Sequence, residues 1–397
     1  MSILRGARIV LGITGGVAAY KAVDLASKLV QQGAQVDAVL TEAAREFIGP
    51  ASLNAITRRP VHGSVFEQWN SDWTGHLSLG EEADLIVIAP ATANSIANLA
   101  HGLAPDMLYS AVLTSTAPLL VAPAMEDTMF RHAATQQNLE TLRQRGAHII
   151  GPESGRLASG EFGVGRMSEP ATIVGVARMA IGRQGVLAGK RIVVTAGGTR
   201  EALDPVRYLG NRSSGLMGYA VAQAAIDAGA DVILISGPTN LPTPYGATRI
   251  DVQTAVEMKS AVTEAVKGAQ AIVMSAAVAD YRPKDVRSEK IKKSELGATL
   301  SLELVANPDI IAGIAEPGLL KVGFAAETSN LVEHACKKLR EKGLDLVVAN
   351  DAELAIGSRD NQVTFVWPDG AVDELPLLPK EAVAAILIDR ISGLLAV

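Results

Sequence analysis

The sequence predicts an α/β protein built from two three-layer αβα domains, each with a mostly parallel sheet. The chain has 397 residues and 48% of them are hydrophobic, which is enough to form two buried cores. A unit made of a strand, a glycine-rich turn, a helix and a second strand occurs near the N-terminus and again near the middle of the chain. Short apolar segments with the composition of strands follow each unit, as expected of parallel sheets covered by helices.

The first unit begins at residues 8–13, where RIVLGI has the branched apolar composition of a buried strand. The turn TGGVAAYK leads into a helix that extends to about Gln32, and Gly33 ends that helix. QVDAVLT supplies the second strand. Later strands are expected at DLIVIAP, PLLVAP and HIIGP, before a closing helix in ATIVGVARMAIGR.

The second unit repeats this order. Residues 191–195 form its strand, AGGT forms its turn, and a helix extends from about Ser214 to Ala228, where Gly229 stops it. DVILIS is the second strand, and later strands are expected at AIVMSA, KVGFAA and DLVVAN. Each half should therefore carry a parallel sheet with helices on both faces.

The segment QGVLAGK joins the two halves, and we place the boundary near Val186. The expected domains are residues 1–186 and residues 187–397.

Charge and cysteine content exclude several classes of protein. The formal net charge of -6 and the pI near 5.6 provide no basic surface for nucleic acid. The single cysteine, Cys336, excludes an intrachain disulfide and fits a reducing cytoplasm. No segment near the N-terminus is apolar for long enough to form a signal peptide or to span a membrane. We expect a cytoplasmic protein that acts on small molecules.

Residues 192–218 combine a buried strand, two glycines, a charged loop and the start of a helix. Gly197 and Gly198 permit a close approach of the backbone to a ligand. The groups that offer hydrogen bonds to an anion near the helix start belong to Asn211, Ser213, Ser214 and Gly215. The sequence therefore predicts a phosphate site in this segment.

The glycine turns indicate the class of cofactor, because neither turn reads GxGxxG. A dinucleotide-binding fold requires an acid at the tip of its second strand to bind a ribose hydroxyl. The first unit ends that strand with Thr41, although Glu42 follows, and the second ends it with residues 236–238, SGP. Hydroxyls and main-chain amides suit the phosphate of a mononucleotide better than an adenosine ribose. A nicotinamide oxidoreductase is the disfavoured alternative, and glycines that only close tight turns are another.

Both halves carry motifs that occur together in one family. The C-terminal half contains AGGTRE, LDPVRYLGNRSSGLMG, SAAVADY, EKIKK, NPDI, GFAAET and VVAND. The N-terminal half contains GITGGVAAYK, TEAA, GHLSLG, DLIVIAPATANSIANLAHG, PAM and GRM. Over essentially its whole length the chain resembles the bifunctional coenzyme A biosynthesis proteins, which fuse phosphopantothenoylcysteine decarboxylase to phosphopantothenate–cysteine ligase. The resemblance implies a flavodoxin-like or Rossmann-like flavin domain followed by a Rossmann-like ligase domain.

The ligase reaction calls for positive charge. A carboxylate acylates an amine only after it becomes a mixed anhydride with a nucleotide phosphate, and this step crowds negative charges together. Lys290, Lys292 and Lys293 in EKIKK supply cations, although such a cluster is also typical of a solvated surface. The resemblance assigns formation of the acyl-cytidylate to Lys290 and its capture by cysteine to Asn211. The alternative role of Asn211 is a helix N-cap.

The resemblance also implies a CTP site and magnesium. Asp280 follows the strand AIVMSAAV at its carboxyl end, where open α/β sheets bind ligands. Magnesium follows from the phosphate charge, and its protein ligands are unknown. The residues that the resemblance places around CTP are Ala276, Asp280, Lys290, Asn307, Pro308, Asp309, Ile310, Ile311, Phe324, Lys338 and Lys342.

The decarboxylase reaction calls for a flavin. Loss of carbon dioxide from an N-acylated cysteine needs an electron sink, and oxidation of the thiol-bearing carbon to a thioaldehyde creates one. FMN is the expected cofactor. His76 in TGHLSLG matches the family's base or substrate clamp, although a lone histidine is more often structural. The residues that the resemblance places at FMN are Gly15, Gly16, Thr41, Ala91, Thr92, Asn94, Ser110 and Met125.

Two positions depart from the family pattern. In many relatives PAM is followed by an asparagine that binds the substrate carboxylate, and this chain has Glu126. In many relatives the flap before GRM carries a cysteine that protonates the enethiolate, and this chain has Ser159. A serine hydroxyl is a far weaker acid than a thiol, whose pKa is about 8.5. We expect decarboxylation to survive with Glu126, Ser159 or a water in place of the thiol. The alternative is an active ligase with an impaired flavin domain.

The flap itself extends from Glu153 to Arg166 as a glycine-rich loop, which we interpret as a lid over the flavin site. For assembly, the resemblance implies a homo-oligomer with trimeric contacts among flavin domains and dimeric contacts among ligase domains. Together these contacts generate a dodecamer with the flavin site at a trimer interface.

Overall fold

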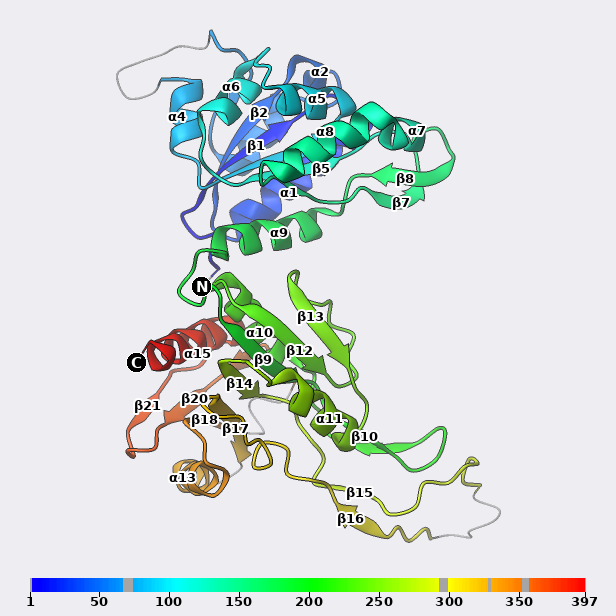
Figure 1. Cartoon of the computed structure of the whole chain (residues 1–397), viewed down its shortest axis with the longest axis vertical. Coiled ribbons are helices and arrows are strands. Elements are labelled where there is room, and N and C mark those ends of the chain that lie inside the picture. The colour runs from blue at the N-terminus through cyan, green and yellow to red at the C-terminus, as the bar shows by residue number, and fades with distance from the viewer. Residues whose placement is uncertain (1, 67–73, 293–298, 328–329, 352–356, 397) are drawn as a thin grey trace. The chain divides into compact units, whose positions relative to one another are not determined.

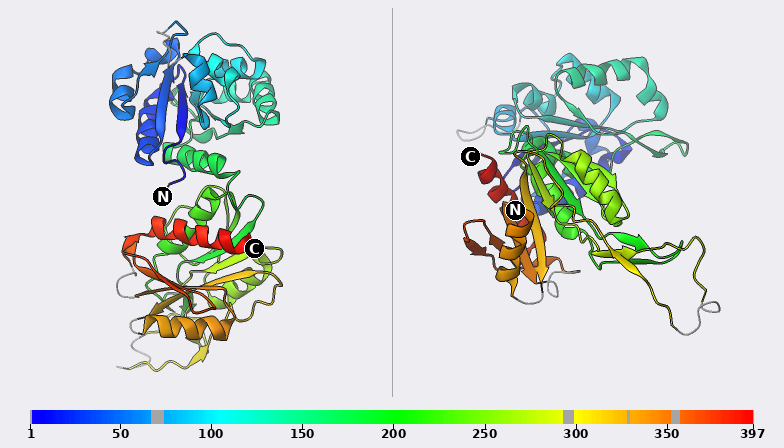
Figure 2. Two further views of the ribbon diagram at one scale, coloured as in Figure 1. Left: turned by 90° about the vertical axis from the view of Figure 1, so that its left-hand side faces the viewer. Right: turned by 60° about the horizontal axis from the view of Figure 1, so that its bottom comes forward.

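The computed structural model describes residues 2–66, 74–292, 299–327, 330–351 and 357–396 (Figure 1). The chain divides into two compact units, Ser2–Gly182 and Arg183–Val397, and each unit has its own sheet. Helices cover both faces of each sheet (Figures 1 and 2), which confirms the expected fold class.

The N-terminal unit contains six parallel strands in the order β3-β2-β1-β4-β5-β6. This is the order of a doubly wound Rossmann-type sheet, and it reverses direction between β1 and β4. The strands expected from RIVLGI, QVDAVLT, DLIVIAP, PLLVAP and HIIGP are all present. The strands are β1 Arg8–Ile13, β2 Gln35–Leu40, β3 Val61–His62, β4 Leu85–Ala91, β5 Leu119–Pro123 and β6 His148–Ile149.

Helices α1, α3 and α9 cover one face of this sheet, and α4, α5, α6 and α8 cover the other. Strand β1 alternates between the two cores, because Leu11 packs with α1 and α9 while Val10 packs with α5 and α6. Both faces are buried, so the strand has no polar side chain after Arg8. The helices are η1 Val17–Ala19, α1 Tyr20–Gln31, α2 Glu42–Arg45, α3 Pro50–Thr57, α4 His76–Glu81, α5 Ala93–His101, α6 Met107–Thr114, α7 Asp127–Arg131, α8 Ala133–Gln144 and α9 Pro170–Gly182.

The segment expected to be a glycine-rich loop is an antiparallel ribbon. Strand β7 Glu153–Arg156 pairs with β8 Phe162–Arg166, and only residues 157–161 form the loop at its tip. The hydrogen bonds of this ribbon give the proposed flap a regular structure, which its glycine content did not predict.

The C-terminal unit contains eight strands in the order β13-β12-β9-β14-β17-β18-β20-β21. The first six are parallel, in agreement with the sequence, whereas β20 and β21 form an antiparallel edge that we did not expect. The strands are β9 Arg191–Ala196, β12 Asp231–Ser236, β13 Ala247–Asp251, β14 Ala271–Met274, β17 Leu320–Glu327, β18 Leu346–Asp351, β20 Val363–Val366 and β21 Val372–Glu374.

Helices α10 Leu216–Asp227 and α15 Lys380–Leu395 pack together on one face of this sheet. Helices α11 Ala255–Ala265 and α13 Leu331–Lys342 pack on the other. Short two-stranded ribbons project from the unit. They are β10 Arg200–Ala202 with β11 Tyr208–Gly210, β15 Tyr281–Pro283 with β16 Leu304–Ala306, and β19 Asp360–Asn361 with β22 Leu378–Pro379.

Candidate active sites

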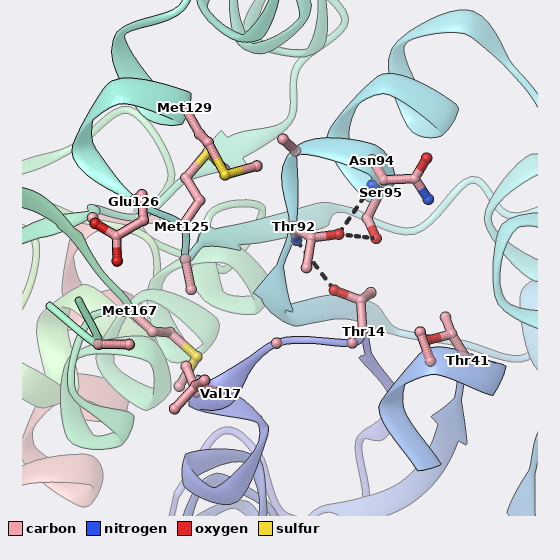
Figure 3. A pocket seen from close by; sticks show the side chains of 18 of the residues that line it. Thr14, Val17, Thr41, Thr92, Asn94, Ser95, Met125, Glu126, Met129 and Met167 are labelled. Carbon is pink, nitrogen blue, oxygen red and sulfur yellow. Dashed lines mark hydrogen bonds between the residues drawn. The ribbon is translucent and has the colours of Figure 1, made fainter. Parts of the chain in front are cut away.

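A cavity of about 1480 Å³ opens in the N-terminal unit at the carboxyl ends of β1 and β4, where the strand order reverses. Doubly wound folds bind ligands at this position. Thr14 and Gly15 follow β1, Thr41 follows β2, and Thr92 follows β4. Figure 3 shows that the threonines lie on one side of the cavity and that methionine side chains face it from the other.

Hydrogen bonds fix the polar side. The Thr14 hydroxyl donates to the Pro90 carbonyl at 2.8 Å and accepts from the Thr92 amide at 3.1 Å. Thr92 caps α5, because its hydroxyl accepts from the Ser95 amide at 3.3 Å. Thr41 caps α2 in the same way. These side chains are therefore oriented before any ligand binds.

The two glycines of the first turn have different surroundings. A Cβ atom at Gly15 would overlap Ala43, whose carbonyl carbon and oxygen would lie 2.8 and 2.9 Å away. A Cβ atom at Gly16 would meet only the Thr92 methyl group, at 3.5 Å, which is an ordinary contact. The protein's own packing requires glycine at position 15, whereas position 16 has room for a methyl group.

The opposite side carries three methionines, Met125, Met129 and Met167, with Val17 beside Met167 (Figure 3). The segment that carries Met125 is fastened to the flap ribbon, because the Met125 amide donates to the Gly165 carbonyl at 3.0 Å. Asp127 accepts from the Val164 amide at 2.9 Å, and its hydrogen bond with Arg131 lowers the pKa of Asp127. The carboxylate that anchors the ribbon is therefore ionised at neutral pH.

Glu126 and Ser159 contact each other. The Ser159 hydroxyl donates to Glu126 Oε2 at 3.0 Å, and the Ser159 amide lies 3.3 Å from Glu126 Oε1. Glu126 lines the cavity, and Ser159 is exposed on the loop at the tip of the flap ribbon. The two departures from the family pattern thus form one hydrogen-bonded pair at the cavity wall.

The structure places the other expected flavin residues in two groups. Ala91 is buried inside β4 and Ser110 bonds the Asp106 carbonyl at 2.9 Å, so neither is among the residues that line the cavity. His76 begins α4, where its carbonyl accepts from Thr114 at 3.2 Å, and it also lies outside the lining. The expected residues that do line the cavity are Gly15, Gly16, Thr41, Thr92, Asn94, Met125 and Glu126.

Several charged residues of the lining were missed from the sequence, among them Lys21 and Asp106. Lys21 binds the Met167 carbonyl at 3.3 Å and Glu169 at 2.8 Å, so it holds the end of the flap segment. Asp106 caps α6, and burial raises the pKa of its carboxyl group. An aspartate directly before the apolar run MLYSAVLT is a recognisable N-cap signal.

The C-terminal unit has a smaller cavity, of about 270 Å³, at the carboxyl end of β14, beside the middle of β17 and beside α13. Lys290 lies on an exposed loop and is not among its lining residues, and Lys293 lies outside the described residues. The cavity brings together every other residue expected around CTP. They are Ala276, Asp280, Asn307, Pro308, Asp309, Ile310, Ile311, Phe324, Lys338 and Lys342.

Positive charge in this cavity is partly balanced. Lys342 Nζ lies 2.9 Å from Asp309 Oδ2, and Lys338 Nζ donates to the Phe324 carbonyl at 2.6 Å. Burial alone would raise the pKa of Asp309, but its hydrogen bonds with Lys342 and the Ala312 amide outweigh burial and lower it. Asp309 is therefore a carboxylate at neutral pH, and a bound polyphosphate would compete with it for Lys342.

Asn211 does not cap a helix. Helix α10 begins at Leu216 and its N-cap is Gly215, with a φ of 80° that favours glycine. The Asn211 side-chain amide donates to the Ala277 carbonyl at 3.0 Å, so it joins the loops that follow β11 and β14. The N-cap interpretation of Asn211 is wrong.

Within the described ranges, no group of three or more His, Cys, Asp or Glu side chains is placed to hold a metal ion. None of the helices that these residues form is both long and apolar enough to cross a membrane.

Two doubly wound domains, each with a cavity beside the ends of its central strands, define a class of fused α/β proteins with two ligand sites. Residues 2–182 match the family model "Flavoprotein", and residues 187–395 match "DNA/pantothenate metabolism flavoprotein C-terminal domain". The chain belongs to the family of coenzyme A biosynthesis bifunctional proteins. It is an enzyme of coenzyme A biosynthesis that combines phosphopantothenoylcysteine decarboxylase with phosphopantothenate–cysteine ligase, so the resemblance is confirmed.

The similarity extends over full-length relatives. The coenzyme A biosynthesis bifunctional protein CoaBC of Vibrio cholerae is 47% identical over 98% of this chain and 99% of its own length. The CoaBC protein of Escherichia coli K12 is 46% identical over 98% of this chain and 97% of its own length. A crystal structure of the C-terminal domain of a CoaBC protein is 43% identical, with a TM-score of 0.47, and covers 54% of this chain and 99% of that domain. The family favours two active domains over an impaired flavin domain.

Substitution of each turn glycine by alanine tests whether the packing of the protein itself requires glycine at that position. We expect Gly15→Ala to lower the free energy of unfolding by about 1–3 kcal/mol, because the methyl group overlaps Ala43. Gly16→Ala is the matched control and should change it by less than about 0.5 kcal/mol. Urea unfolding of flavin-free protein measures both, and a Gly15→Ala variant as stable as wild type would refute the packing argument.

Proposed function

We propose that residues 187–397 join cysteine to 4′-phosphopantothenate at the expense of CTP, through an acyl-cytidylate. We also propose that residues 1–186 hold FMN and decarboxylate the product to 4′-phosphopantetheine. The observation that carries the first proposal is the C-terminal cavity, which gathers lysines and amides from four separate parts of the chain. The flavoprotein match and the cavity at the strand reversal support the second. The single cysteine fits the cytoplasmic location that we propose.

In the ligase domain, Lys338 and Lys342 provide positive charge for the triphosphate. Asn307 is held in place, since its amide donates to the Asp280 carbonyl at 2.7 Å and its side chain to the Ala279 carbonyl at 2.8 Å. Magnesium would bind mainly through phosphate and water oxygens, which needs few protein carboxylates. Lys290 would stabilise the charge that develops as the acyl-cytidylate forms, and Asn211 would orient the cysteine that captures it.

In the decarboxylase domain, the polar side of the cavity fits a phosphate and sugar, and the methionine side fits a flat ring. FMN would supply a reversible acceptor for a hydride while it is bound. The protein's own task is to orient the substrate and to move a proton. The Glu126–Ser159 pair stands at the cavity wall where the family uses an asparagine and a cysteine. We therefore assign the final proton to Glu126, with Ser159 orienting its carboxyl group.

The proposed assembly is a dodecamer of trimeric flavin domains and dimeric ligase domains. Val17, Tyr20 and Met129 line the flavin cavity, yet they are 60%, 62% and 49% exposed in the single chain. Apolar side chains this exposed favour cover by another copy. His76 does not line the cavity of its own chain, so its proposed role requires a site shared between subunits.

The nucleotide is tested by product analysis. Protein incubated with phosphopantothenate, cysteine, magnesium and one nucleoside triphosphate at a time should form phosphopantothenoylcysteine, CMP and pyrophosphate with CTP. Mass spectrometry identifies these products. Lys338→Gln with Lys342→Gln should raise the KM for CTP by about 10-fold or more, because two charge-assisted contacts are lost. Turnover that is equally fast with every nucleotide, or unchanged in the double variant, would contradict the assignment of this cavity.

The proton donor is tested by separating the two halves of the decarboxylase cycle. Glu126→Gln should release carbon dioxide in a first turnover but form the saturated thiol product about 100-fold more slowly, the usual scale for loss of a general acid. The control is Glu161→Gln, on the same loop but outside the cavity lining. Full turnover by Glu126→Gln would remove Glu126 from this role.

Shared sites are tested by mixing two inactive variants. Coexpressed His76→Asn and Glu126→Gln chains should recover about one quarter of wild-type decarboxylase activity, because random trimers pair the intact residues at that frequency. Light scattering against the chain mass of 41.4 kDa measures the assembly. No recovery in mixed particles of the expected size would mean that each chain completes its own site.

A further inference from the structure

Asp204 is a buried carboxylate in the LDPVRY motif, between β10 and β11, and none of the roles above uses it. The residue is only 3% exposed. Its Oδ1 atom accepts from the amides of Val206 and Arg207, both at 2.7 Å, and so shapes the turn in which it lies.

The second oxygen reaches a distant segment of the chain. Oδ2 accepts from the Ile291 amide at 3.1 Å and from the Arg207 guanidinium at 3.0 Å. The same guanidinium nitrogen donates to the Ile291 carbonyl at 2.9 Å. Both polar groups of the Ile291 backbone are therefore held by one acid and one base, and the Arg287 amide donates to the Leu203 carbonyl at 3.0 Å nearby.

Ile291 directly follows Lys290, in the exposed segment that leaves the β15–β16 ribbon. The Lys290 side chain forms no hydrogen bond or ion pair with any described residue. An exposed lysine on a segment without regular structure has many accessible positions. Asp204 and Arg207 bind the backbone of Ile291, the residue next to Lys290, so they restrict the positions that this lysine can reach.

We propose that Asp204 is a positioning residue of the ligase, which holds the Lys290 segment in place for formation of the acyl-nucleotide through its bonds with Ile291 and Arg207. This inference rests on the proposed role of Lys290. Burial alone would raise the pKa of Asp204, but the surrounding amides and Arg207 outweigh burial and lower it. The carboxylate therefore keeps its four acceptor contacts throughout the neutral range, and they weaken only as the pH falls through its lowered pKa.

Asp204→Asn is the direct test. It replaces one carboxylate oxygen by an NH2 group, which cannot accept the two hydrogen bonds that the oxygen accepted. We expect the kcat for pyrophosphate release from CTP and phosphopantothenate to fall about 10- to 100-fold, the scale for a misplaced catalytic group. The KM for CTP should change by less than about 2-fold, because Asp204 does not line the nucleotide cavity.

A double-mutant cycle separates positioning from a general structural role. If Asp204 acts through Lys290, then Asp204→Asn should slow a Lys290→Gln enzyme by less than about 2-fold further. If the two losses multiply, Asp204 does not act through Lys290 and the proposal is wrong.

Amide hydrogen exchange measures the contact between Asp204 and the Ile291 backbone without any assay of activity. Asp204→Asn should increase hydrogen exchange about 10-fold or more in the peptide of residues 284–292, which contains the Ile291 amide. Glu201→Gln is the matched control, because Glu201 is 2% exposed in the same hairpin but accepts from the Ala255 amide at 2.9 Å. Exchange that stays at the wild-type rate in Asp204→Asn would overturn the proposal.

Arg207→Gln covers the case in which Asp204→Asn fails to fold. The Arg207 side chain is 47% exposed, so its loss should leave the fold intact while it removes two of the bonds. The same lack of additivity with Lys290→Gln is expected, and multiplied losses would again refute the proposal. Wild-type enzyme that releases no pyrophosphate from CTP would refute the proposed function instead. The exchange result would still show whether Asp204 holds the Ile291 backbone.

Discussion

Burial of parallel strands on both faces governs where chemistry can occur in this protein. Helices cover each sheet from two sides, so a polar side chain on a strand is buried and needs an internal partner, as Asp37 of β2 has in Arg59. Polar groups gather more readily where strands end and loops begin. Both cavities lie at the carboxyl ends of central strands for this reason, and both are walled by segments that follow directly after a strand.

The two domains use this common edge differently. In the N-terminal domain, threonine caps and a glycine packed against Ala43 make one side rigid, while the flap ribbon provides the other. In the C-terminal domain, the loops after β11 and β14 are joined through Asn211, and paired lysines stand on α13. The proposed hydride acceptor would need a shaped slot, whereas the proposed triphosphate would need balanced charge. One fold could serve both because the loops, not the sheets, differ.

The sequence predicted the parts of the fold that depend on local composition. Apolar runs such as RIVLGI and DVILIS became strands at the expected positions, and the residues after them became cavity walls. The short ribbons and the antiparallel edge of β20 and β21 were not predicted, because their strands are brief and lack a clear period. Contacts between polar residues far apart in the sequence could not be predicted either. Ser159 meets Glu126 across 33 positions and Ile291 meets Asp204 across 87, and no pattern in the chain marks either pair.

Thioether side chains bend at three torsions and polarise readily, so a surface made from Met125, Met129 and Met167 can mould itself to a planar ring. The same chemistry makes the exposed Met129 sensitive to peroxide, since a sulfoxide would introduce a strong dipole beside the proposed ring position. The described lining of the proposed nucleotide cavity includes one methionine, Met274. If the proposed sites are correct, methionine oxidation would impair the flavin-dependent step before the ligase step.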